Sequence, residues 1–85
     1  MIYNINQDID DVDEFNKNMI NKGYDSVSKS FLNKGFGDII INVTIRDSKV
    51  ETITAYKNNE ITTVPVDVLK IVKMDIKECL GWVFE

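Results

Sequence analysis

Apolar residues recur at helical spacing near the start of the chain. Val12, Phe15 and Met19 fall at positions i, i+3 and i+7, which places them on one side of an α-helix. Gly23 follows and is a natural C-terminal stop, because glycine readily adopts the left-handed backbone that often ends a helix. The pattern predicts an amphipathic helix over residues 11–22.

A second, shorter helix is predicted directly after the first. Asp25 or Ser26 can cap its N-terminus through a side-chain oxygen. Gly35 would end it. The apolar positions of this helix are Val27, Phe31 and Leu32.

The period of the pattern changes to two after Asp38, as in a strand with one buried face. The apolar set of this first strand is Ile39, Ile41, Val43 and Ile45. Residues 50–56 are rich in β-branched side chains and predict a second strand, and residues 61–64 predict a third. The residues that favour turns between these strands are Asp47, Ser48, Asn58 and Asn59.

A final helix is predicted after Pro65, which has no N–H for the strand ladder and therefore closes the third strand. Asp67 can cap this helix, and Gly81 would end it. Residues 82–84 then form an apolar tail that we expect to fold back onto the core. The buried stripe of the helix is Val68, Val72, Ile76, Cys79 and Leu80.

Together these elements predict an α+β fold in a single domain over residues 1–85. One N-terminal helix, or two if the second one forms, precedes a three-stranded antiparallel meander. The C-terminal helix packs on one face of the sheet, so that its buried stripe contacts the apolar side of residues 39–45. A chain of 85 residues whose composition does not divide it into separately foldable halves fits one domain.

The predicted order of helix, three strands and helix resembles that of the double-stranded RNA-binding domain. That family relies on a lysine cluster at the start of its last helix, whereas here the helix opens with Val66, Asp67 and Val68. The order is also similar to that of some small acidic phage inhibitors, anti-CRISPR proteins among them. The chain shares no residue motif with them, so neither resemblance assigns a site residue.

Negative charge is concentrated near the start of the chain. The net charge is −4, and residues 1–14 carry five acids and no base. These acids can cap the first helix and complement its dipole, or they can form a patch that binds a partner. The candidate partner-binding acids are Asp10, Asp11, Asp13 and Glu14.

Two aromatic residues are further candidates for partner binding. Tyr24 and Trp82 are possible interface anchors, because tyrosine and tryptophan are enriched at binding hot spots. Packing in the core or at its edge is the alternative for both residues.

The sequence contains no recognisable catalytic or metal-binding motif. The sequence has no histidine, and its one cysteine, Cys79, lies on the apolar stripe of the last helix, which predicts a buried and inert thiol. A calcium loop starting at Asp8 would need glutamate at its twelfth position, where the chain has Met19. We therefore expect no enzymatic activity, no bound metal and no cofactor.

These observations favour a non-enzymatic protein-binding module. The small size, the acidic segment and the missing catalytic motifs favour an inhibitor or accessory protein of a phage or mobile element. Nine of the ten basic residues are lysine, a bias of AT-rich coding that points to a low-GC bacterium or its phages as the source. The single cysteine and the lack of an export signal or apolar span predict a cytoplasmic protein outside the membrane. A homodimer through an unpaired strand edge or Trp82 is a further hypothesis. The alternative function is a small nucleic-acid-binding regulator that uses the meander and the face of Lys70, Lys73 and Lys77.

Overall fold

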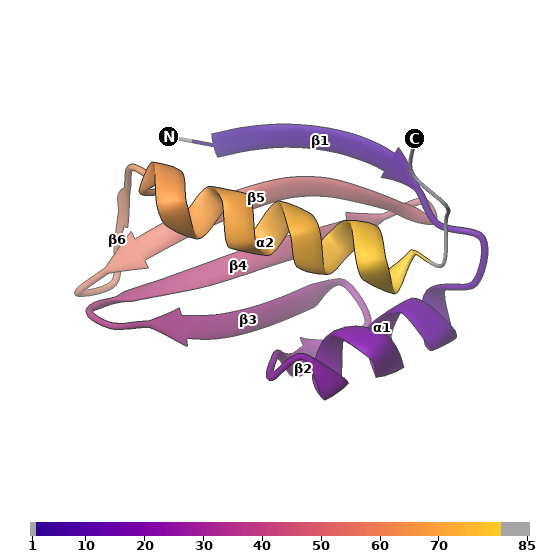
Figure 1. Ribbon diagram of the computed structural model, residues 1–85. Helices are drawn as coiled ribbons and strands as arrows, with labels where there is room; N and C mark the ends of the chain where they lie inside the picture. Colours follow the sequence, from indigo (N-terminus) through magenta and orange to yellow (C-terminus); the bar gives the residue numbers. More distant parts are fainter. Residues whose placement is uncertain (1, 81–85) are drawn as a thin grey trace.

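A computed structural model describes residues 2–80, in which six strands form one antiparallel sheet and two helices lie on one of its faces (Figure 1). In chain order the elements are β1 (Ile2–Asp8), α1 (Val12–Asn21), β2 (Asp25–Ser28), β3 (Phe31–Phe36), β4 (Ile39–Arg46), β5 (Lys49–Lys57), β6 (Glu60–Thr62) and α2 (Val66–Cys79).

The strands are ordered β1-β5-β4-β3-β2 across the sheet, and neighbouring strands are antiparallel. Thr54 of β5 is opposite Ile2 of β1. The next residue of β5, Ala55, is opposite Thr62 of β6. Strand β6 therefore continues the sheet beyond the end of β1 on the same side of β5, and β2 forms the opposite edge.

The central strand β4 follows the alternation in the sequence. Ile41 and Val43 are fully buried, and Ile45 is 5% exposed. The turn that leads into β5 contains Asp47 and Ser48 with φ angles of 52° and 58°. Two successive left-handed residues are what a tight two-residue hairpin turn requires. The predicted strand and the predicted turn are both confirmed.

Helix α1 also forms as the sequence predicts. Asp11 has an extended backbone, and its carboxylate accepts a hydrogen bond of 3.2 Å from the N–H of Glu14. This bond satisfies one of the N–H groups that have no partner within the helix. Phe15 and Met19 are buried, and Gly23 follows the helix with a φ of +99°.

Helix α2 forms where the pattern places it, but its start differs from the prediction. Val72 is fully buried, Ile76 is 2% exposed, and both belong to the same core cluster as Ile41. Pro65 occupies the N-cap position, and no side chain caps the helix. The predicted role of Asp67 as the cap is wrong, since this residue lies inside the first turn.

The predicted three-stranded meander with helices before and after it is wrong. The sheet contains three further strands, β1, β2 and β3, and the first element of the described residues is a strand rather than a helix. The fold is therefore α+β with a sheet of five strands plus the short β6. Because of the three further strands, the order of the elements no longer resembles that of the double-stranded RNA-binding domain.

The predicted second helix is instead the hairpin of β2 and β3. A helical stripe would bury Val27, Phe31 and Leu32 together, but Val27 is 64% exposed and Phe31 is 44% exposed, while Leu32 is fully buried. The hydroxyl of Ser28 accepts a hydrogen bond of 3.2 Å from the N–H of Ser30. Such local bonds favour a turn over a helix.

Strand β1 carries only a weak alternating pattern. Ile5 packs against the core, but Asn6 has a φ of 54° and the pairing register shifts between Asn4 and Gln7. A bulge of this kind interrupts the period of two. For this reason the sequence pattern did not predict a strand in this segment.

The two faces of the sheet differ. Helices α1 and α2 lie on one face, and no helix of the described residues covers the other (Figure 1). Asn42 and Thr44 of β4 alternate with buried residues and therefore lie on the uncovered face. The three lysines of the alternative function lie on α2, on the opposite side of the sheet: Lys70, Lys73 and Lys77. The uncovered face and these lysines do not form a common surface.

Candidate functional site

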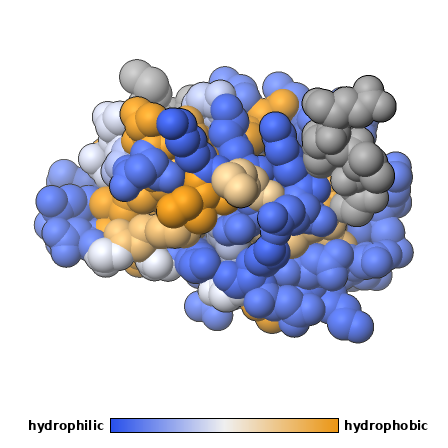
Figure 2. Space-filling view, in the orientation of Figure 1, coloured by the Kyte–Doolittle hydropathy of each residue, from blue (hydrophilic) through white to orange (hydrophobic). Residues whose placement is uncertain are grey.

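Two hollows adjoin the C-terminal end of α2, and Leu80 lines both of them. One hollow lies against the start of α1, and the other lies between β1 and α2. Figure 2 shows the face of the molecule that carries α2. Hydrophilic side chains cover its α1 end, while hydrophobic side chains gather over the first half of α2.

The first hollow combines three carboxylates with an apolar floor, and we call it the acidic hollow. Asp10, Asp11 and Glu14 line it from the loop before α1 and from the first turn of that helix. Its volume is about 240 Å³. Asn18 also lines it, and the apolar residues of the lining, which we call its floor, are Ile9, Phe15, Cys79 and Leu80. Three of the four predicted acidic site residues thus border one cavity.

The start of α1 fixes the position of these carboxylates. Asp11 is the N-cap and bonds the N–H of Glu14. The preceding loop is anchored by Ile9, which is 6% exposed and donates its N–H to the carbonyl oxygen of Ser48 at 2.8 Å. Asp13, the fourth predicted acid, is exposed in the first turn and does not line the hollow.

The four acids have no ion-pair partner among residues 2–80. Like charges held near one another repel, and the positive end of the α1 dipole offsets only part of this repulsion. A cation that binds here would relieve it, so the surface is electrostatically complementary to a base. The ion pairs of the described residues lie elsewhere and join Lys22 to Glu78, Arg46 to Glu51, and Lys49 to Asp8.

Cys79 forms part of the floor and is unsuited to nucleophilic chemistry. Its side chain is buried and unpaired, as the sequence predicted. Burial raises the pKa of the Cys79 thiol, and the thiolate is the reactive form of cysteine. The Cys79 carbonyl oxygen accepts a hydrogen bond of 3.4 Å from the side-chain amide of Asn18, which joins α2 to α1.

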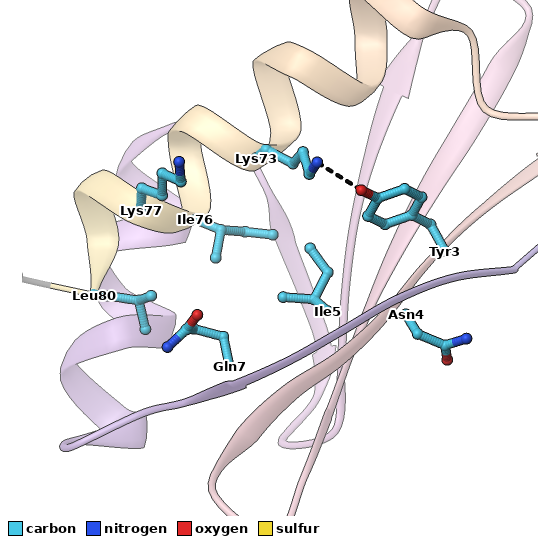
Figure 3. Close-up of a pocket in the computed structure, with 8 residues that line it drawn as sticks. All are labelled: Tyr3, Asn4, Ile5, Gln7, Lys73, Ile76, Lys77 and Leu80. Carbon is cyan, nitrogen blue, oxygen red and sulfur yellow. Dashed lines mark hydrogen bonds between the residues drawn. The ribbon is translucent and has the colours of Figure 1, made fainter. Parts of the chain in front are cut away.

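The second hollow lies between β1 and α2, and we call it the lysine groove (Figure 3). Lys73 and Lys77 line it from α2, and Tyr3 and Ile5 point toward α2 from β1. The Lys73 ammonium donates a hydrogen bond of 2.7 Å to the Tyr3 hydroxyl and lies 4.6 Å from the centre of that ring. The other lining residues are Asn4, Gln7, Ile76 and Leu80, and the volume is about 240 Å³. No acid from residues 2–80 lines this groove.

Tyr24, a predicted partner-binding residue, belongs to the core. Its side chain is 1% exposed, and its hydroxyl donates a hydrogen bond of 2.9 Å to the Asp75 carboxylate. Burial and this hydrogen bond raise the pKa of Tyr24 well above its ordinary value. The Lys34 ammonium lies 5.1 Å from the centre of the ring. Tyr24 therefore ties the segment after α1 to α2 and is not exposed to a partner.

A second contact at this junction joins Lys22 to Glu78. The hydrogen bond to the Glu78 carboxylate raises the pKa of the Lys22 ammonium. Together with Tyr24 and Asp75, this pair fixes the end of α1 against α2.

Trp82, the last predicted site residue, lies outside the described residues, as do Gly81 and the rest of the apolar tail. Sequence reasoning missed the β1 side of the lysine groove because it did not recognise β1. The one signal in that segment was the alternation of Tyr3 and Ile5 with the polar Asn4.

Residues 2–80 hold no group of three or more His, Cys, Asp or Glu side chains arranged to bind a metal ion. The carboxylates of the acidic hollow are thus not placed to share one ion. Neither helix in this part of the chain has the length and apolar character needed to cross a membrane, since the longer one, α2, has 14 residues against the roughly 20 of a span.

Comparison of the chain with protein-family models, with curated proteins and with solved structures found no match.

Proposed function

We propose that this protein is a non-enzymatic protein-binding module whose acidic hollow receives a basic side chain of the partner. One observation supports this: Asp10, Asp11 and Glu14 border a cavity with an apolar floor. Lysine and arginine are apolar along their stems and charged at their tips. A basic side chain would place its stem against the exposed edge of Leu80 and its charge among the carboxylates.

The size of the acidic hollow suits one side chain. Pockets for small molecules usually enclose about 300–1,000 Å³, whereas this hollow measures about 240 Å³. A side chain presented by another protein needs no deeper cavity, because the surrounding surfaces supply the rest of the contact.

The remaining charge extends the attraction beyond the hollow. Asp13 lies exposed beside it, and exposed charges at the rim of an interface act mainly on the association rate. Basic surfaces are typical of proteins that bind nucleic acid. We therefore propose an inhibitor or accessory protein that occupies such a surface, and the lysine-rich composition supports an origin in a phage or mobile element of a low-GC bacterium.

The alternative of a nucleic-acid-binding regulator has less support. Affinity for nucleic acid comes mainly from lysine and arginine contacts with phosphates along one surface. The uncovered face of the sheet carries polar uncharged residues such as Asn42 and Thr44, and the lysines of α2 lie on the other side. The net charge of −4 also opposes binding to a polyanion.

Selection from a displayed library of random peptides tests the proposal. Enriched peptides are synthesised and titrated into the protein while NMR follows its backbone amides. We expect enrichment of peptides in which a basic residue adjoins apolar ones, with the largest shifts at Asp11, Glu14 and Leu80. Enrichment of acidic or uncharged peptides, or shifts centred elsewhere, would count against the acidic hollow.

Two variants of equal net charge sharpen this test. The first removes the four acids near α1, as Asp10→Asn, Asp11→Asn, Asp13→Asn and Glu14→Gln. Asparagine caps a helix about as well as aspartate, so α1 is retained. The second removes four exposed acids elsewhere, as Asp25→Asn, Asp38→Asn, Asp47→Asn and Glu60→Gln. The peptide should lose most of its affinity for the first variant only. An equal loss of affinity for both variants would mean that the net charge of the protein, and not the acidic hollow, attracts the peptide.

A further inference from the structure

We propose that the lysine groove binds an extended acidic segment of polypeptide, which adds to the sheet as a new strand along β1. This second site is separate from the acidic hollow and does not depend on it. Three features of the described residues carry the proposal: the open edge of β1, the direction of its side chains and the charge of the groove.

The outer edge of β1 has no partner strand within the described part of the chain. Among residues 2–80, β1 pairs with β5 alone, and its seven residues make it longer than β2, the four-residue strand at the other edge. An unpaired edge exposes N–H and C=O groups to which another strand can bond, and proteins usually block such edges with lysine, proline or a bulge. Strand β1 contains no lysine or proline. Its bulge comprises Ile5 and Asn6, where the register with β5 shifts, and residues 2–4 are regular.

Side chains of an added strand would enter the groove. Directly opposite residues of two paired strands project on the same face of the sheet. Tyr3 points toward α2 (Figure 3), so a partner residue opposite Tyr3 would place its side chain beside Lys73. The next partner side chain on this face would reach the part of the groove that Ile5 and Ile76 line.

The groove favours an acid at the first of these positions and an apolar residue at the second. Lys73 lies beside the first position, and no acid of the described residues lines the groove. The hydrogen bond from Lys73 goes to the neutral hydroxyl of Tyr3, so this contact does not neutralise the charge. Ile5, Ile76 and Leu80 are the aliphatic residues of the lining, and they offer an apolar contact to the second side chain.

A polypeptide fits the groove better than a free small molecule. Sites for small molecules usually enclose about 300–1,000 Å³ and bury most of the ligand, whereas this groove measures about 240 Å³ and is open on one side. A segment that adds to a sheet edge gains affinity from main-chain hydrogen bonds, and pockets for alternate side chains provide its specificity.

Titration with a designed peptide tests the proposal. The probe is a short peptide with an acetylated N-terminus and an amidated C-terminus. Every second residue is threonine, and the two residues between the threonines, which are meant to face the groove, are first glutamate and then valine. The control peptide has lysine in place of glutamate. We expect the acidic peptide to bind at least fivefold more tightly than the control, with NMR shifts at the amides of residues 2–5 and 73–77. Equal affinities, or no binding of the acidic peptide at millimolar concentration, would overturn the proposal.

Methylation of the peptide backbone distinguishes strand addition from attachment by charge alone. In an extended strand, successive N–H groups point to opposite sides, so alternate ones face β1. Methyl groups on one alternate set of nitrogens should weaken binding tenfold or more, while the other set changes it less than twofold. If both sets have the same effect, the peptide is not paired with β1.

Substitutions in the protein provide a matched comparison. Lys73→Gln should weaken the acidic peptide about two- to fivefold, the range for an exposed ion pair. Lys29→Gln, at an exposed turn between β2 and β3, should leave binding unchanged, and equal effects of the two substitutions would argue against the groove.

The variant without the four acids near α1 should bind the acidic peptide at least as tightly as the wild type, which separates this proposal from the proposed function. Concentration-dependent dimerisation that protects β1 would instead assign the edge to a second copy of the chain.

Discussion

Replacing Tyr24 by phenylalanine removes one hydroxyl from the core and leaves the ring in place. That hydroxyl donates a hydrogen bond of 2.9 Å to the Asp75 carboxylate, and the residue is 1% exposed. A hydrogen bond to a charged group contributes about 1.5–3 kcal/mol to stability. We expect Tyr24→Phe to lower the free energy of unfolding by about 1.5–2 kcal/mol at pH 7, at the low end of that range because Asp75 is only partly buried and water can reach it.

The difference between wild type and variant should shrink at alkaline pH. Burial and the bond to Asp75 raise the pKa of Tyr24 in the folded protein above its ordinary value of 10.0. The stabilisation is therefore full below pH 10 and is lost as the pH rises above it, because the unfolded chain releases the proton first. One pH unit above that value, the loss is about 1.4 kcal/mol. At pH 11 the two proteins should be nearly equal in stability.

Urea denaturation of both proteins at several values between pH 7 and pH 11 measures this convergence. The other titrating groups are common to both proteins, so their effects cancel in the difference. A shift of the midpoint at constant m-value reports a change in stability. A difference that stays constant up to pH 11 would refute the raised pKa, and a difference below about 0.5 kcal/mol at pH 7 would refute the strong hydrogen bond.

Three further predictions concern the core, the thiol and a turn. Val72 is fully buried, so Val72→Ala should lower the free energy of unfolding by about 1–3 kcal/mol in the same assay, and a loss below about 0.5 kcal/mol would mean that α2 does not fill the core. Cys79 is 4% exposed, so a chromogenic thiol reagent should modify it far more slowly in buffer than in denaturant, and equal rates would place it at the surface. Ser48 has a φ of 58°, which costs a non-glycine residue about 1–2 kcal/mol. Ser48→Gly should therefore raise the thermal midpoint, and an unchanged or lower midpoint would contradict this.

Elements that bury one regular face could be predicted from the sequence. Phe15 and Met19 of α1 are buried at helical spacing, and Ile41 and Val43 of β4 are buried at a spacing of two. In both elements the side that faces the core differs in polarity from the side that faces water. The period of the apolar residues then reports the secondary structure directly.

The hairpin of β2 and β3 could not be predicted in this way because apolar residues lie on both of its faces. Leu32 is opposite Val43 on the core side. Phe31, its neighbour, lies on the uncovered side and is 44% exposed. Neighbouring apolar residues such as Phe31 and Leu32 fit a helical pattern in the sequence. The segment forms a strand because it pairs with β4.

The candidate site was partly visible in the sequence. The acids near α1 form a local run of charge, so their position followed from the sequence alone. The apolar floor of the hollow could not be predicted from the sequence. Cys79 and Leu80 lie far along the chain and line the hollow only because α2 packs beside α1. The lysine groove depends in the same way on β1 lying beside α2.

The salt dependence of association tests the proposed function most directly. A peptide from the selection is mixed in a stopped-flow instrument with the wild type, with the variant that lacks the four acids near α1, and with the variant that lacks four acids elsewhere. Wild type and the second variant should associate at similar rates that fall steeply with ionic strength, while the first variant should associate slowly with a shallow dependence. If all three proteins share the same rate and the same salt dependence, the acids near α1 serve only to start a helix, and the acidic hollow is not the binding site.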